Sequence, residues 1–441
     1  MAGTIGLVIL LLLVVLLALE VPVAAALGLT AIAVLGIFKP AMLWVLPQTF
    51  FAAMKPFNLI AIPFFIVAGI LLGRSGISRR LVRFADCLMG RRASGLAIVT
   101  VVVSIFFAGI SGSGPADVAA LGLILIPAMV EAGFSRRFSA ALMAAGGGIG
   151  IIVPPSIALI LYGVVAQDYN PSVSISKLFI AGIIPGILVG LSLIAYIVLF
   201  QKGKPKGNSD KQAVSNAPDE PKSLGAAFKE ASLGLLAPVI IIGGIYSGVF
   251  SPTEAAAVVV VYALAIDLLV YRELRWRDVP RALTEAGATS GGVLFIVASA
   301  SLLAWVLNYF EVAQEASALL LSITEQKWLL LLLINGVILI AGCLLDAISI
   351  MYLLLPIMLP VTQQMGVDPN HFGIIVVVNL AIGQITPPVG VNLFVACGVS
   401  RVSLGEISRG VWPLVAAEAM ALLLITYLPS LSLLLPHLLI Q

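Results

Sequence analysis

Two segments of this chain, 233 positions apart, carry nearly the same unusual motif. Residues 148–155 read GIGIIVPP, and residues 381–388 read AIGQITPP. The same offset relates Gly109 to Gly342 and recurs at other glycines, prolines and leucines, so the chain is a duplicated unit. Each copy carries a segment broken by Gly and Pro within an apolar run. In a bilayer, broken helices at matching positions of two repeats are the best indication of a transport site in a sequence.

The composition places these repeats in a membrane. Hydrophobic residues make up 61% of the chain and charged residues only 10%, whereas soluble proteins have about 45–50% and about 25%. Apolar runs such as 231–250 and 411–429 approach the roughly 20 residues that one crossing needs. The first run, Ile5–Leu19, follows no basic segment and is interpreted as a retained helix. The sequence predicts an all-α polytopic membrane protein with roughly ten crossings.

Charge and cysteine usage argue against several classes of function. The net charge is +3, and the basic residues lie in loops that flank the membrane, so nucleic-acid binding is not expected. Cys87, Cys343 and Cys397 are too scattered for a disulfide framework or a metal site. The chain has only two histidines, His371 and His437, so zinc and haem chemistry is not expected and no cofactor is predicted.

Basic residues indicate which loops face the cytoplasm. Lys and Arg cluster in five stretches, which we expect to be cytoplasmic loops: 74–92, 136–137, 202–229, 272–281 and 401–409. Four gaps between apolar segments are poor in Lys and Arg and should face outward: 167–171, 251–254, 311–327 and 363–371. Residues 41–55 are too short and interrupted to assign, although an interfacial helix fits them.

One apolar stretch, Leu96–Met129, has arginines beyond both ends, so both ends should lie on the cytoplasmic side. Its middle, Gly109–Pro115, reads GISGSGP, which cannot form a continuous helix. We therefore predict a re-entrant hairpin at about 96–130 that opens from inside. The equivalent stretch 328–361 is flanked by loops with few basic residues, so it should be a hairpin that opens from outside and turns near Gly342–Asp346.

The remaining apolar segments alternate across the membrane without conflict. In the first repeat, 1–200, the expected crossings are 4–19, 21–38, 57–74, 138–166 and 177–199. In the second repeat, 231–441, they are 233–250, 254–270, 286–310, 372–399 and 411–430. Segments 138–166 and 372–399 are the broken helices, and 201–230 is a flexible cytoplasmic linker. Because five crossings is an odd number, the second repeat should be inverted, as in many secondary transporters.

The broken segments supply the chemistry of a candidate site. Pro154-Pro155 and Pro387-Pro388 remove amide donors and free carbonyls one turn earlier, and such oxygens suit a small alkali cation. Helices that restart near Ser156 and Gly390 would point their positive ends at the same place, where an anion could bind. We expect each hairpin tip to meet the broken helix of its own repeat, which gives two related half-sites.

Each half-site has its own candidate residues. In the first repeat they are Ser104, Gly109, Ser111, Ser113, Asp117, Gly148, Pro154 and Ser156. In the second they are Gly342, Asp346, Ser349, Gly383, Thr386, Pro387 and Asn392. Asp117 and Asp346 are carboxylates within apolar hairpins, where a charge is costly enough to indicate a function. Glycines and prolines also serve packing and kinks in membrane helices, but their duplication at a fixed offset favours a site.

These segments resemble a known family along almost the whole chain. The sequence is similar to the large membrane subunit of tripartite ATP-independent periplasmic (TRAP) transporters in the stretches 62–69, 109–117, 150–156, 178–186, 252–256 and 383–394. The resemblance implies sodium-driven uptake of a small organic acid anion, such as a C4-dicarboxylate, sialic acid, another sugar acid or a keto acid, across the bacterial inner membrane. It also implies an elevator mechanism, in which two hairpins and two broken helices move against a fixed scaffold.

The resemblance further implies partners and ligands. A soluble periplasmic protein would deliver the substrate, and a small four-helix membrane subunit, expected as a separate chain, would complete the membrane unit. Sodium would bind through Ser104, Gly109, Gly148, Pro154, Gly342, Asp346, Ser349, Gly383, Thr386 and Pro387. The substrate would bind through Ser111, Ser113, Asp117, Ser156 and Asn392. One departure is the stretch 346–349, which reads DAIS where a proline is expected after the aspartate.

Two other classes of function compete with this interpretation. Residues 109–112 read GISG, which matches the Gly-x-Ser-Gly pattern of rhomboid serine proteases, but neither histidine lies in a helix that could pair with Ser111. A self-sufficient sodium- or proton-coupled dicarboxylate transporter would also have inverted repeats. It would use Asp117 or Asp346 as a proton carrier and need no partner protein. We expect neither an enzyme nor an open channel, because duplicated closed hairpins suit alternating access.

Overall fold

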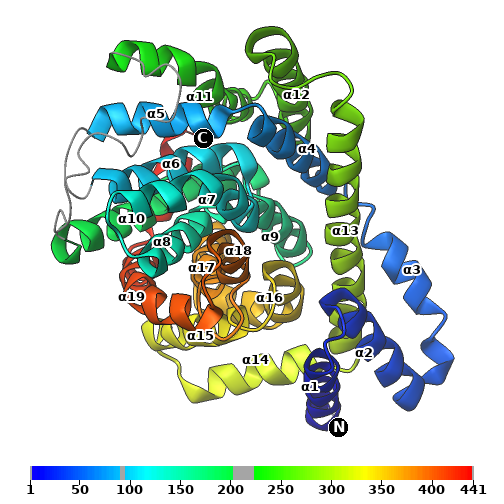
Figure 1. The fold of residues 1–441 in the computed structure, drawn as a ribbon. Coiled ribbons are helices and arrows are strands. Elements are labelled where there is room, and N and C mark those ends of the chain that lie inside the picture. The colour runs from blue at the N-terminus through cyan, green and yellow to red at the C-terminus, as the bar shows by residue number, and fades with distance from the viewer. Residues whose placement is uncertain (1, 90–94, 202–222, 440–441) are drawn as a thin grey trace.

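A computed structural model describes residues 2–89, 95–201 and 223–439. This part of the chain contains 20 α-helices and no β-strand, which confirms the all-α prediction (Figure 1).

Eight helical stretches are long and apolar enough to cross a membrane. Six of them are single helices: α7 (Gly114–Glu131), α10 (Ile175–Phe200), α11 (Leu224–Tyr246), α13 (Val279–Tyr309), α16 (Ala347–Gln364) and α19 (Leu404–Tyr427). The other two are longer than the α-helix they contain: Phe57–Arg74 contains α4 (Ala61–Arg74), and Pro252–Tyr271 contains α12 (Pro252–Ala265). The outer surface is also apolar: Leu7, Leu10 and Leu11 are each more than half exposed. Such side chains belong against lipid, so this is a multi-pass membrane protein.

The remaining α-helices of the described part are shorter. They are α1 (Ala2–Ala18), α2 (Val23–Phe38), α3 (Val45–Ala52), α5 (Ile77–Met89), α6 (Gly95–Ser111), α8 (Arg136–Gly148), α9 (Ile157–Gln167), α14 (Val312–Ile323), α15 (Lys327–Gly342), α17 (Pro369–Gly383), α18 (Val391–Ser400) and α20 (Ser430–Leu439). Within each expected broken crossing the helix stops and restarts: α8 is followed by α9, and α17 by α18.

The duplication is visible in the helix bounds. Adding 233 to the bounds of α7 gives 347 and 364, which are the bounds of α16. The same shift carries α9 to 390–400, where α18 spans 391–400. The repeat in the sequence is therefore also a repeat of helices. The inverted orientation of the second copy and the domain limits stay predictions.

Two stretches expected as loops are helical. Within the basic stretch 74–92, residues 77–89 form α5, because Ile77, Leu81 and Ala85 recur at helical spacing on one buried face. Charge clustering marks a membrane flank but does not exclude a helix lying there. The stretch 311–327, expected as an outer loop, contains α14.

The structure also assigns helices within two further segments. The unassigned stretch 41–55 contains α3. Residues 224–230 of the expected linker already belong to α11, because the hydroxyl of Ser223 accepts a hydrogen bond from Ala226 N at 3.3 Å and caps the helix early. The rest of that linker, residues 202–222, lies outside the described residues.

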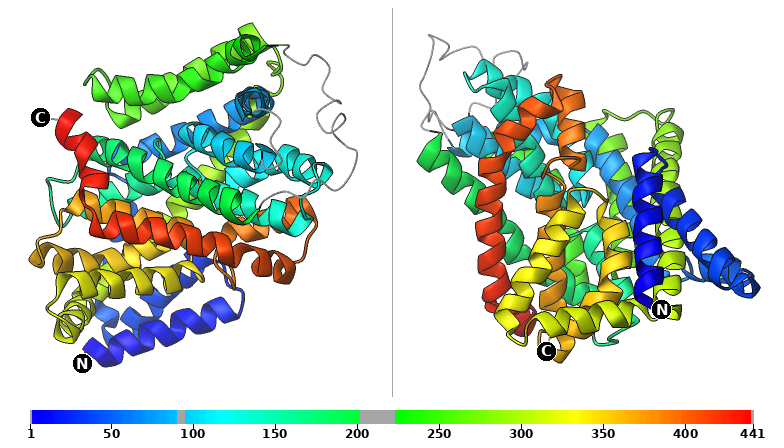
Figure 2. Two further views of the ribbon diagram at one scale, coloured as in Figure 1. Left: turned by 90° about the vertical axis from the view of Figure 1, so that its left-hand side faces the viewer. Right: turned by 90° about the horizontal axis from the view of Figure 1, so that it is seen from below.

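The helices of the hairpins and broken crossings occupy the middle of the bundle. Figure 1 shows α6 to α9 and α15 to α18 gathered at the centre, with α4, α12 and α13 along one outer side and α14 along another. Helix α13 packs against α2, α4 and α16, so it borders this central group. Figure 2 shows α1 and α2 on the side of the bundle opposite α11.

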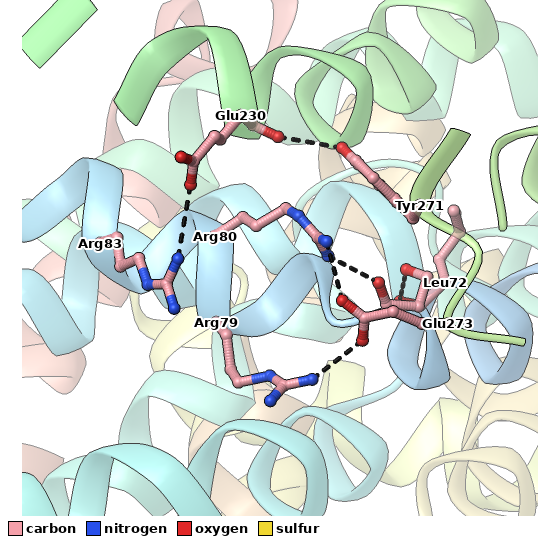
Figure 3. A network of polar contacts seen from close by, with 8 residues as sticks. Leu72, Arg79, Arg80, Arg83, Glu230, Tyr271 and Glu273 are labelled. Atoms are coloured by element: carbon pink, nitrogen blue, oxygen red, sulfur yellow. Dashed lines mark hydrogen bonds and ion pairs between the residues drawn. The ribbon is translucent and has the colours of Figure 1, made fainter. Parts of the chain in front are cut away.

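The amphipathic helix α5 is held to its neighbours by ion pairs (Figure 3). Arg79 and Arg80 contact the two carboxylate oxygens of Glu273, at 2.9 and 2.7 Å, in the segment that follows α12. Arg83 reaches Glu230 of α11 at 3.5 Å. These contacts connect α5 to two segments that are far away in the sequence.

The ion-pair network predicts unequal effects of two glutamate substitutions. Glu273 pairs with two arginines and its side chain is 28% exposed, whereas Glu285 pairs only with Arg74 and is 52% exposed. Because isolated exposed pairs contribute little, Glu285→Gln should lower the free energy of unfolding by less than about 0.5 kcal/mol and Glu273→Gln by about 1–2 kcal/mol. Thermal unfolding in detergent measures both. Equal melting temperatures for the two variants would contradict a structural role of the network.

Candidate functional site

The first hairpin tip contacts the break in the first broken helix. Helices α6 and α7 meet at Gly112, whose φ is +64°, a backbone conformation that favours glycine. Gly112 O accepts a hydrogen bond from Ile157 N, the first residue of α9, at 3.4 Å. A Cβ atom at Gly112 would lie 2.6 Å from Pro155 O. The tip therefore closes against the Pro154-Pro155 segment, and only glycine permits this approach.

The second hairpin makes the equivalent contact in the second repeat. Cys343 O, just after α15, accepts a hydrogen bond from Val389 N at 3.2 Å, and Val389 lies directly after Pro387-Pro388. The backbones also touch at the residue before Cys343, because a Cβ at Gly342 would lie 3.0 Å from the Cα of Gly383. Helix α18 then begins after Gly390, which has a φ of +53°. The two proline pairs, Pro154-Pro155 and Pro387-Pro388, thus lie at two junctions of the same kind, each closed by a hairpin tip.

Two candidate residues cap the helices that begin at these junctions. The hydroxyl of Ser156 accepts a hydrogen bond from Leu159 N at 3.2 Å and donates one to Ile151 O. One carboxylate oxygen of Asp346 accepts hydrogen bonds from Ile348 N and Ser349 N, each at 3.0 Å. The other oxygen accepts one from the Ser349 hydroxyl at 2.6 Å. Both residues therefore have a structural role as helix caps, which the sequence analysis had not assigned to them.

Asp117, in the first turns of α7, is different because it is only half satisfied. Its side chain is fully buried, and one carboxylate oxygen accepts a hydrogen bond from the Ser111 hydroxyl, which in turn accepts one from Ser113 N at 3.2 Å. The second oxygen, Oδ2, has no hydrogen-bond partner among the described residues. It points at Gly150, where any Cβ atom would clash with it. The hairpin tip thus presents one free carboxylate oxygen to the broken helix.

Side chains of the second repeat reach the same place. A Cβ atom at Gly114 would lie 2.7 Å from Gln384 Oε1 and 3.0 Å from Asn392 Nδ2. Asn392 Nδ2 also donates a hydrogen bond to Ala144 O of α8 at 3.3 Å. Gln384 Oε1 and Asn392 Oδ1, like Asp117 Oδ2, are buried and have no partner among the described residues. We call Asp117, Gln384 and Asn392 the central cluster.

The central cluster can bind a cation or a polar ligand. Three buried oxygens without partners would each cost free energy in a membrane interior, so something that donates to them is expected there. Carboxylate and amide oxygens are hard ligands suited to alkali cations, and they also accept hydrogen bonds from hydroxyl groups. The surrounding glycines Gly114, Gly147 and Gly150 let the backbone segments approach one another closely. The arrangement is suited to binding.

The other candidates lie around this centre but do not form one cluster. The Ser104 hydroxyl is buried, has no hydrogen-bond partner among the described residues, and faces Gly146, where a Cβ would lie 2.5 Å away. Gly109 faces Pro238 of α11, and Gly148 faces Ala381 O of the second repeat. The Thr386 hydroxyl donates to Ile382 O at 2.6 Å. The peptide bonds Pro154-Pro155 and Pro387-Pro388 are both cis.

The sequence analysis missed some buried polar residues. Gln384 lies in the repeated motif but was not selected, although it differs from its counterpart Ile151 in the other copy. Glu418 of α19 is fully buried, and neither carboxylate oxygen has a partner among the described residues. A lone carboxylate in the apolar run 411–429 was the signal that could have identified it.

The geometry gives no support to the protease alternative. The Ser111 hydroxyl is engaged with Asp117, while His371 Nε2 lies 3.3 Å from Thr426 O, between α17 and α19. Ser111 therefore has a carboxylate beside it and no imidazole.

Close packing at the second junction predicts opposite effects of two glycine substitutions in α15. Gly342→Ala would push a methyl group against Gly383, and such overpacking should lower the free energy of unfolding by about 1–3 kcal/mol. Gly336 has no neighbouring atom within 4 Å of a Cβ position. Gly336→Ala should therefore be neutral or stabilise by up to about 1 kcal/mol, because alanine favours a helix. Melting temperatures in detergent test this, and a Gly342→Ala variant as stable as Gly336→Ala would show that the junction is loosely packed.

Comparison with known proteins identifies the family. Residues 10–431 match the family described as "Tripartite ATP-independent periplasmic transporter, DctM component". The chain is 43% identical to the isethionate TRAP transporter permease protein DctMQ of Oleidesulfovibrio alaskensis over 93% of this chain, and it spans 63% of the length of that protein. It is 39% identical to the C4-dicarboxylate TRAP transporter large permease protein DctM of Pseudomonas aeruginosa, over 93% of this chain and 94% of that one.

A third relative and a solved structure agree with this match. The sialic acid TRAP transporter large permease protein SiaM of Vibrio cholerae is 37% identical, with 89% of each chain covered. The crystal structure of the Alcanivorax borkumensis YdaH transporter covers 88% of this chain and 87% of its own at a TM-score of 0.62 and 17% identity, which shows a shared fold. The matched family consists of transporter permeases, so the protein is not an enzyme. The chain belongs to the DctM family of TRAP transporters as a large membrane permease subunit.

Proposed function

We propose that this chain is the permease through which a small organic acid anion enters the cell across the inner membrane, driven by a sodium gradient. The observation that carries the proposal is the central cluster, where unpartnered oxygens from both repeats meet at the two helix breaks. The relatives are named for isethionate, C4-dicarboxylates and sialic acid, which are all organic anions. Because isethionate is a sulfonate, the expected substrates extend beyond carboxylates.

In this proposal the two junctions bind sodium and the cluster between them binds substrate. The sodium candidates, at the junctions and around them, are Ser104, Gly109, Gly148, Pro154, Gly342, Asp346, Ser349, Gly383, Thr386 and Pro387. Substrate would contact Ser111, Ser113, Asp117, Ser156 and Asn392, and we add Gln384 to this set because its side-chain oxygen lies beside Gly114. Sodium beside Asp117 and the amide side chains would offset the negative charge of an arriving anion.

The proposed motion is an elevator movement of the central helices. Helices α6 to α9 and α15 to α18 would move together with the bound ions and substrate, while α4, α11, α12 and α13 stay fixed. The inverted orientation of the second repeat would make the outward-open and inward-open states structurally related. A periplasmic binding protein would deliver the substrate, and a small four-helix membrane subunit would complete the fixed part.

The alternative is a carrier that works without partners. It would couple transport to protons or sodium on its own, and Asp117, with its free carboxylate oxygen, would be the proton carrier. The family match favours the three-part system.

Reconstitution distinguishes the two proposals. The chain would be placed in proteoliposomes with a four-helix subunit and a binding protein encoded beside it, and uptake of labelled succinate, sialic acid and isethionate would be followed. We expect uptake of at least one of them only with an inward sodium gradient and all three proteins. Uptake by this chain alone, or uptake that follows a proton gradient without sodium, would instead establish the self-sufficient carrier.

Thr386 offers a test of the sodium site itself. Its hydroxyl is buried beside Pro387 and uses its proton on Ile382 O, so its oxygen lone pairs remain available for a cation. Thr386→Val keeps the shape and removes this oxygen, whereas Thr386→Ser keeps the oxygen. Thr386→Val should raise the sodium concentration for half-maximal uptake by about tenfold, equivalent to about 1.4 kcal/mol, and Thr386→Ser should change it little. If Thr386→Val needs no more sodium than Thr386→Ser, this hydroxyl does not bind the ion.

A further inference from the structure

A cavity lined by arginines lies at the end of the molecule where α8 and α19 begin and α18 ends. It is an open groove of about 420 Å³ lined by Arg136, Arg137, Arg401, Val402, Glu406 and Arg409, and all of these residues except Val402 are exposed. Four of these six residues are arginines, and they come from three separate segments of the chain. We call this space the arginine cavity.

The positive charge of the arginine cavity is not neutralised by neighbouring acids. Among the described residues, none of the four arginines has a carboxylate within 4.0 Å. The one acid in the lining, Glu406, is already used: its Oε2 accepts hydrogen bonds from Ser403 N at 3.3 Å and from the Ser403 hydroxyl at 3.0 Å. The lining thus carries four positive charges and one negative charge, a net charge of +3 that equals that of the whole chain.

The backbone around the cavity adds to this field. Arg136 is the first residue of α8, and Glu406 lies in the first turn of α19, so two helix N-termini with positive partial charges lie at the cavity, against one C-terminus, that of α18. Arg401 is fixed in the left-handed conformation, with a φ of +56°, and its N–H donates to Cys397 O at 2.8 Å. The position of the Arg401 backbone is therefore fixed by the end of α18.

A second cavity adjoins the first and is mainly apolar. Its volume is about 380 Å³, it shares Arg136 and Arg401 with the arginine cavity, and Ile126, Val130 and Val399 form much of its wall. Glu131 is the only acid in its lining. A ligand with an anionic head and an apolar part could therefore occupy the two spaces together.

We propose that the arginine cavity binds the phosphate group of an anionic phospholipid, whose acyl chain lies in the adjoining apolar cavity. Arginine binds phosphate oxygens through two parallel N–H groups. Several arginines facing one space favour a headgroup with a net negative charge over one whose phosphate is neutralised by its own cation. We expect this end of the protein on the cytoplasmic side, because 136–137 and 401–409 are basic stretches, and anionic headgroups there attract arginine. A free phosphate ion has the same recognition chemistry, but it would leave the apolar cavity without a role.

Lipid retention by the purified full-length chain tests this proposal. Phosphatidylglycerol, phosphatidylcholine or inorganic phosphate would be titrated into the detergent-solubilised protein, with bound lipid counted by native mass spectrometry and stability followed by thermal unfolding. The site variant is Arg136→Gln with Arg409→Gln. The matched control is Arg277→Gln with Arg281→Gln, which removes the same charge from exposed arginines elsewhere on the basic side and outside any ion pair of the described residues.

We expect the site variant to bind phosphatidylglycerol at least tenfold more weakly than the unchanged protein, and the control variant to stay within about twofold. Phosphatidylcholine should not distinguish the three proteins. An equal loss in both variants would overturn the proposal, because the lipid would then follow overall charge. Stabilisation by inorganic phosphate alone, to the same extent as by the lipid, would overturn the phospholipid assignment. If the double variant does not fold, the single variant Arg409→Gln against Arg281→Gln gives the same comparison.

Discussion

The constraint on which this structure depends is the absence of water that could satisfy backbone groups where a membrane helix breaks. Each break is closed by the hairpin tip of its own repeat: Ile157 N donates to Gly112 O, and Val389 N donates to Cys343 O. A hairpin and a broken helix are therefore one structural unit, because neither leaves its backbone satisfied alone. The glycines at the tips follow from this, since Cβ atoms would hold tip and break apart.

The two repeats share this backbone arrangement but not their polar side chains. At the offset of 233, Asp117 corresponds to Ile350, Gln384 to Ile151 and Asn392 to Leu159. Each position of the central cluster is thus polar in one copy and apolar in the other. The duplicated breaks provide two similar junctions, and the differences between the copies provide a single cluster between them, with the carboxylate from one copy and the amides from the other.

This difference explains how far the sequence could predict the site. The Gly and Pro motifs located both breaks, both hairpin turns and the restarts at Ser156 and Gly390, because these features are set by local backbone chemistry. The contact of Gln384 and Asn392 with Gly114 depends on how the two copies pack, and no local pattern encodes that. Charge clustering likewise marked the flank at 74–92 but concealed α5, whose apolar spacing was the better guide.

The glycine run at the end of α8 packs this helix closely against helices of both repeats. A Cβ at Gly146 would meet Ser104 of α6, one at Gly147 would meet Val118 of α7 and Asn392 of α18, and one at Gly148 would meet Ala381 of α17. Successive helix positions point in directions about 100° apart, so these contacts lie on different sides of α8. Because these glycines have no Cβ atoms, α8 lies in close contact with these four helices, and it has little space to slide against them. A movement of α8 would therefore carry the first hairpin, α6 and α7, and the second broken helix, α17 and α18, together with whatever the central cluster binds.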